Sequence, residues 1–166
     1  MGLFNFFKKN QSNTLNEIND KKVNSNETLD EFTQDMLTAA NHFVDRSINR
    51  YKGLVFSVNS LVVVDYICEN AIDVYPDLTE VQKNNFIRSV GAYVFEVARQ
   101  NFGGKYYWYD ALNQPILVTG QPEFEASILA FDKVEGRLVK GKEDNIPFYF
   151  AGYVEKVKAK QSALIV

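Results

Sequence analysis

The chain has little of the chemistry on which most metal and catalytic sites depend. Its 166 residues include one cysteine, Cys68, and one histidine, His42. The usual zinc site draws four ligands from several Cys and His side chains, so this pair excludes one. The sequence also has no glycine-rich loop leading into a helix, and no serine in a nucleophile-elbow context. We therefore expect no metal, no cofactor and no catalytic residue.

A basic surplus and long apolar runs are also missing. The net charge is −3 and the isoelectric point is near 5.2, whereas nucleic-acid binders usually show a basic stripe or a high isoelectric point. The longest apolar run, near residues 60–68, is interrupted by Asp65 and is far shorter than the roughly 20 residues that span a bilayer. A lone cysteine suits a reducing compartment. These features exclude nucleic acid as a partner and predict a cytoplasmic protein.

The chain is rich in aromatic residues. It is also long enough to form one domain with a sizeable core. Hydrophobic residues make up 46% of the sequence, with 13 Phe and 9 Tyr, so we expect aromatic packing in the core. Residues 1–26 are poor in apolar side chains after position 7 and are interpreted as a tail or linker. Residues 27–160 are interpreted as a single domain.

The first ten residues, MGLFNFFKKN, allow two interpretations. Leu3, Phe4, Phe6 and Phe7 form a short apolar cluster followed by two lysines, a composition that can lie on an anionic membrane. One or two helical turns bury little area, so the alternative is a loose tail. Membrane contact through residues 1–10 is therefore a secondary hypothesis.

Apolar spacing predicts about five helices. A capping box of Thr28 and Glu31 is expected to begin the first helix, and Thr79 to cap the third. On the second helix, Asp65, Glu69 and Asp73 recur every four residues and are expected to form one solvated face.

At Gly103-Gly104 the spacing of apolar residues changes from a helical pattern to a strand pattern. One glycine can end the helix in a conformation with positive φ, and the next gives the backbone freedom to turn. Residues 105–111, KYYWYDA, then read as a strand, 116–120 as its antiparallel return, and 123–127 as a short third strand. The sequence predicts an α+β fold with about five helices packed on a small two- to three-stranded antiparallel sheet.

The aromatic strand is the main candidate for a binding surface. Side chains alternate across a strand, so Tyr106 and Trp108 share one face while Tyr107 and Tyr109 share the other. One pair is expected to pack on the helices. The other pair, together with residues 116–118, can form a surface for a protein partner. The alternative is that this pair packs within the domain, with the tyrosine hydroxyls at the edge of the sheet.

Glu96 is the candidate for an acid or base. It lies inside the third helix, near Tyr93, and a partly buried carboxylate can have a raised pKa. Arg99, three residues later, can neutralise it instead. An enzyme or small-molecule binder centred on Glu96, Tyr93 and Arg99 is the alternative to protein binding, and it requires a pocket beside Glu96.

Residues 54–150 resemble a set of small bacterial domains of unknown function. The matching motifs are Ser60-Leu61 with Asp65; Gly91-Ala92-Tyr93 with Glu96; Gly103-Gly104 with Trp108; and Lys133-Val134 with Arg137-Leu138. The resemblance implies an α+β fold without enzymatic activity, in a domain similar to immunity or accessory proteins of bacterial gene clusters. The leading hypothesis is thus a non-catalytic, cytoplasmic protein-binding domain.

Overall fold

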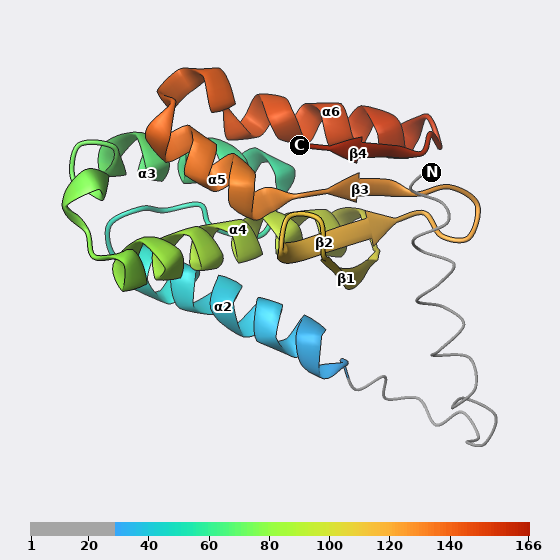
Figure 1. Cartoon of the computed structure of the whole chain (residues 1–166), viewed down its shortest axis with the longest axis horizontal. Coiled ribbons are helices and arrows are strands. Elements are labelled where there is room, and N and C mark those ends of the chain that lie inside the picture. Colours follow the sequence, from blue (N-terminus) through green and yellow to red (C-terminus); the bar gives the residue numbers. More distant parts are fainter. Residues whose placement is uncertain (1–28) are drawn as a thin grey trace.

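The computed structural model describes residues 29–166, in which five α-helices and one four-stranded sheet form an α+β fold (Figure 1). The expected fold class and helix number are confirmed. The helices are α2 (Glu31–Ser47), α3 (Leu61–Ala71), α4 (Glu80–Phe102), α5 (Ala130–Val139) and α6 (Ile146–Lys158), and the strands are β1 (Lys105–Tyr109), β2 (Gln114–Thr119), β3 (Ala126–Ile128) and β4 (Ala163–Ile165).

The sheet is larger and of a different type than the sequence predicted. Its order is β1-β2-β3-β4, with antiparallel pairing among the first three strands and parallel pairing of β4 with β3. The expectation of a two- to three-stranded antiparallel sheet was wrong. A parallel pair needs a long crossover connection, which α5 and α6 supply, and the three residues of β4 are too few to show strand periodicity. The sheet therefore extends beyond residue 160.

Side-chain caps fix where the helices begin. Thr79 and Gln82 form a reciprocal capping box at the start of α4, which confirms Thr79 as the cap. At the start of α2 the cap is Asp30, whose carboxylate accepts from the Thr33 N–H at 2.8 Å. The expected cap, Thr28, lies outside the described residues.

The paired glycines make the turn from α4 into β1. Gly103 and Gly104 have φ values of 74° and 126°, which side chains rarely tolerate. A Cβ atom on Gly104 would also lie 2.8 Å from the Val118 carbonyl oxygen. The predicted helix-to-strand break is confirmed, and it brings β1 back beside the end of α4.

The core lies between the helices and one face of the sheet. Helices α2 and α4 run side by side in opposite directions, and α5 packs on α4 (Figure 1). Tyr106, Leu117, Ala126 and Ile128 point from the sheet into this core. The other face of the sheet has an apolar cluster of its own.

Candidate binding sites

The aromatic strand divides its rings between the two faces of the sheet. Tyr106 is buried in the core, where its ring packs edge-on against Phe95 with centroids 5.7 Å apart. Trp108 shares that face but remains 45% exposed near the end of β1, with its ring 6.5 Å from Phe32. The start of β1 lies closest to α4 because the glycine turn joins them, so helical cover decreases along the strand.

The opposite face, which we call the aromatic sheet face, is defined by strand alternation and register. Its buried centre is Ile116, Val118 and Leu129, surrounded by the half-buried Tyr107, Tyr109 and Leu164. Its further members are Lys105, Gln114 and Ser127. Within residues 29–166, no helix contributes a side chain to this cluster. The aromatic sheet face is therefore separate from the helical core.

A hollow of about 360 Å³ lies at one end of the aromatic sheet face. Tyr107 and Val118 line it together with Lys105 and Gln121. The Tyr107 hydroxyl donates to the Gln121 side-chain oxygen at 2.8 Å, and Gln121 in turn donates to Glu125 at 3.0 Å. This chain of hydrogen bonds holds the Tyr107 ring at the wall of the hollow.

Two buried polar atoms on the same face have no hydrogen-bond partner in the described part of the chain. They are the side-chain nitrogen of Gln114 and the hydroxyl of Ser127. Such atoms are uncommon in native proteins because each costs about 1–3 kcal/mol when it is left unpaired. The aromatic sheet face thus buries two polar groups that have no partner among residues 29–166.

Glu96 is a fully buried carboxylate whose oxygens are already occupied. Arg99 donates to it twice at 2.8 Å, Gln100 at 3.1 Å, and the Tyr106 hydroxyl at 2.9 Å. Tyr93, which the sequence placed beside Glu96, instead directs its hydroxyl to Ser60 at 2.7 Å. Sequence reasoning did not predict the hydrogen bond from Tyr106 to Glu96, because that contact depends on the turn that returns β1 to α4.

The surroundings of Glu96 keep its partners in fixed protonation states. Burial and the neighbouring Glu96 charge raise the pKa of Tyr106, and the hydrogen bond to Glu96 raises the pKa of Arg99. Tyr106 therefore stays neutral and Arg99 stays charged near neutral pH. The cluster is suited to holding β1 against α4, and Glu96 does not line the hollow beside Tyr107.

The acidic ladder of Asp65, Glu69 and Asp73 is a solvated face only in part, so the expectation was wrong for Asp65. Arg137 of α5 is only 2% exposed and donates to both Asp65 oxygens, at 2.9 and 3.1 Å, and to Glu69. Asp65 also accepts from the Ile146 N–H at 3.0 Å, at the start of α6. Asp73, just beyond the end of α3, is exposed as expected, and the Glu69 side chain is 39% exposed. Two of the three acids thus join α3, α5 and α6.

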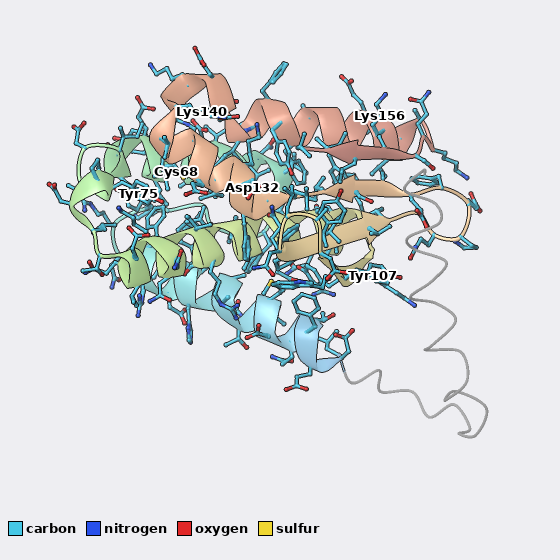
Figure 2. The ribbon with its side chains drawn as sticks, in the orientation of Figure 1. Cys68, Tyr75, Tyr107, Asp132, Lys140 and Lys156 are labelled. Carbon is cyan, nitrogen blue, oxygen red and sulfur yellow. The ribbon has the colours of Figure 1, made fainter. Side chains whose placement is uncertain are left out.

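The one cysteine is buried on α3 and has a free thiol (Figure 2). Burial and the neighbouring Asp65 raise the pKa of Cys68 to about 12, so little thiolate forms near neutral pH. Among residues 29–166, no three His, Cys, Asp or Glu side chains gather in a way that could hold a metal ion.

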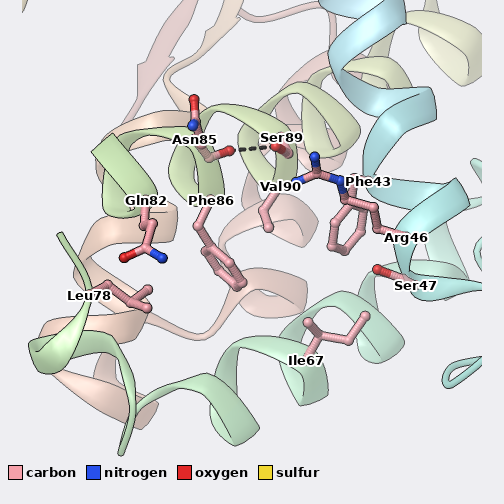
Figure 3. A pocket seen from close by; sticks show the side chains of 10 residues that line it. All are labelled: Phe43, Arg46, Ser47, Ile67, Leu78, Gln82, Asn85, Phe86, Ser89 and Val90. Carbon is pink, nitrogen blue, oxygen red and sulfur yellow. Dashed lines mark hydrogen bonds between the residues drawn. The ribbon is translucent and has the colours of Figure 1, made fainter. Parts of the chain in front are cut away.

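A second hollow, which no sequence pattern identified, lies between α2, α3 and α4 (Figure 3). We call it the α2–α4 cleft, and its volume is about 290 Å³. Its apolar wall is formed by Phe43, Ile67, Leu78, Phe86 and Val90, and its polar side chains are Arg46, Ser47, Gln82, Asn85 and Ser89. The available signal was the presence of two serines, Ser47 and Ser89, at core-facing helical positions.

Comparisons of the chain with protein-family models, with curated proteins and with solved structures found no match. Across residues 29–166, every helix is too short or too polar to cross a membrane. A proposal about function must therefore be based on the geometry of the candidate sites.

Proposed function

We propose that this chain is a non-catalytic protein-binding domain whose partner packs on the aromatic sheet face. The observation that carries the proposal is the hollow beside Tyr107, on a face with its own apolar cluster apart from the helical core. Binding energy at protein interfaces concentrates where an anchor side chain fills such a pocket. A partner side chain in this hollow would contact Tyr107 and Val118.

The charge at the edge of the hollow supports the same role. Lys105, exposed at the edge of the hollow, adds a positive charge suited to an acidic group on the partner. The narrower proposal is a bacterial, cytoplasmic domain with an immunity-like or accessory role.

The test is capture of a defined partner with matched variants. If the gene lies beside a toxin-like reading frame, we expect the purified product of that frame to bind the wild-type chain. Tyr107→Ala and Lys105→Glu should each weaken that complex at least tenfold. Phe148→Ala and Lys142→Glu are the controls, because Phe148 is 82% exposed on α6 and Lys142 is exposed away from the sheet.

Thermal unfolding of each variant separates lost binding from lost folding. Lys105→Glu should unfold at the wild-type temperature, since substitutions at exposed sites usually change stability by no more than about 0.5 kcal/mol. Equal binding by the sheet-face variants and the controls would refute the proposed surface.

The two other hypotheses have less support. The buried, fully hydrogen-bonded Glu96 favours a structural role over an enzyme or binder centred on that residue. The membrane hypothesis rests on residues 1–10, which lie outside the described residues. Liposome co-sedimentation of the chain with and without those ten residues tests it, and equal sedimentation would remove it.

A further inference from the structure

The α2–α4 cleft is a second site, independent of the aromatic sheet face. We propose that it binds a small carboxylate with an apolar tail, such as a medium-chain fatty acid. The tail would lie along the apolar wall, and the carboxylate would meet Arg46 at the mouth. Four observations support this ligand class: the cause of the gap, the charge at its mouth, the amide donors beside that charge, and the volume of the cleft.

The gap exists because small side chains occupy positions that face between helices. Helix α2 contributes Phe43 and Ser47, one turn apart, and α4 contributes Phe86 and Ser89 on one side. Phe43 is buried and Phe86 half-buried, as core residues are, whereas the two serines are too short to fill the space between the helices. The Ser89 hydroxyl is already bonded to the Asn85 carbonyl, so it needs no ligand itself (Figure 3).

The mouth of the cleft carries uncompensated positive charge. Within residues 29–166, no ion pair or hydrogen bond engages the Arg46 guanidinium. A neighbouring hollow of about 280 Å³ shares Arg46 and adds His42, Asp35 and Arg88. Arg88 is neutralised there by Asp35 at 2.6 Å, whereas Arg46 keeps its charge available, in a protein of net charge −3. Arginine binds carboxylates through two parallel hydrogen bonds.

Amide side chains at the mouth favour the same headgroup. The Gln82 oxygen accepts from Thr79 in the helix cap, so the amide nitrogen of Gln82 is the end left to donate. The Asn85 side chain lies on the same wall of α4. Together with Arg46 these groups supply donors, which a carboxylate accepts and a neutral apolar molecule does not.

The size of the cleft sets the length of the tail. Pockets for drug-sized ligands begin at about 300 Å³, so a hollow of about 290 Å³ suits a small ligand of roughly ten non-hydrogen atoms. Octanoate is of this size. For a ligand of this size we expect a dissociation constant on the order of 1 mM or below.

Octanoate and its neutral isostere octanamide are the probes for this site. In titrations of the full chain followed by amide chemical shifts, octanoate should shift residues of α2 and α4 saturably. Arg46→Gln should weaken octanoate binding at least tenfold and leave octanamide binding unchanged. The control is Arg50→Gln, which removes the same charge from the exposed residue that lies over the Tyr51 ring, and it should change neither.

A filling substitution tests the apolar wall separately. Ser89→Leu should abolish binding of both probes while the chain remains folded by circular dichroism, and Ser47→Leu is the second filling variant if Ser89→Leu fails to fold. No saturable binding at about 10 mM, well above the expected constant, would overturn the proposal. Equal octanoate binding by Arg46→Gln and Arg50→Gln, or equal binding of octanoate and octanamide, would also overturn it. Tyr107→Ala should leave octanoate binding intact, so this result does not depend on the proposed protein partner.

Discussion

Individual tyrosines make several of the hydrogen bonds that connect elements in the core of this protein. The Tyr106 hydroxyl donates to Glu96 at 2.9 Å, Tyr149 donates to the Leu129 carbonyl at 2.9 Å, and Tyr153 lies 2.7 Å from the Thr119 hydroxyl. Each ring is buried in the core, so each hydroxyl needs its internal partner. At the residue scale, these tyrosine hydroxyls link neighbouring elements through hydrogen bonds and do not serve as reactive groups.

Because these phenols are buried, stability should fall in alkaline solution. Burial raises the pKa of Tyr106 and Tyr149, and raises the pKa of Tyr153 to about 12. A group whose pKa is higher in the folded state stabilises the fold below its unfolded value, about 10 for tyrosine, and this stabilisation is lost as pH rises towards the folded value. We expect the free energy of unfolding, measured in denaturant, to fall steeply between about pH 10 and pH 12.

Single substitutions test whether the buried tyrosines cause this pH dependence of stability. Tyr153→Phe should reduce the slope, whereas Tyr66→Phe, at a ring that is 58% exposed, should not. Absorbance of tyrosinate should rise together with unfolding. If the buried tyrosines ionise near pH 10 while the fold persists, the account of their burial is wrong.

At the element scale, local signals predicted much of the fold and long-range contacts did not. The Thr79 cap and the Gly103-Gly104 turn are local in sequence, and both were predicted from neighbouring residues. The ion pair of Asp65 and Arg137 joins residues 72 positions apart, so periodicity alone suggested that Asp65 faced water. The strand β4 was missed for the same reason, since it forms only by pairing with β3. The α2–α4 cleft likewise depends on how two distant helices pack.

Removal of Asp65 should separate the three helices that it joins. Asp65→Ala leaves the buried Arg137 without its main partner and frees the Ile146 N–H. Breaking a buried pair costs about 3–5 kcal/mol, and urea unfolding measures this loss. Asp73→Ala, on the same ladder but exposed, should cost no more than about 0.5 kcal/mol.

A double variant tests whether the cost is that of an unpaired charge. Asp65→Ala with Arg137→Met removes both charges and should recover much of the stability lost in Asp65→Ala. Equal losses in Asp65→Ala and Asp73→Ala would show that the ion pair does not join these helices.

At the scale of the whole molecule, the two candidate sites lie at opposite ends of α4 (Figure 1). The α2–α4 cleft is lined by the N-terminal half of that helix, and its C-terminal end turns through the glycines into the aromatic sheet face. Helix α4 is held along its length by α2 and α5 and by the Glu96 cluster. This arrangement keeps the two sites apart, so each can be tested alone.

The most direct test of the proposed function is hydrogen exchange on the partner complex. With the captured partner bound, amides of β1 (Lys105–Tyr109) and β2 (Gln114–Thr119) should exchange more slowly than in the free chain, whereas those of α3 (Leu61–Ala71) should be unchanged. Slower exchange confined to the helices, with β1 and β2 unchanged, would contradict the assignment of the aromatic sheet face as the binding surface.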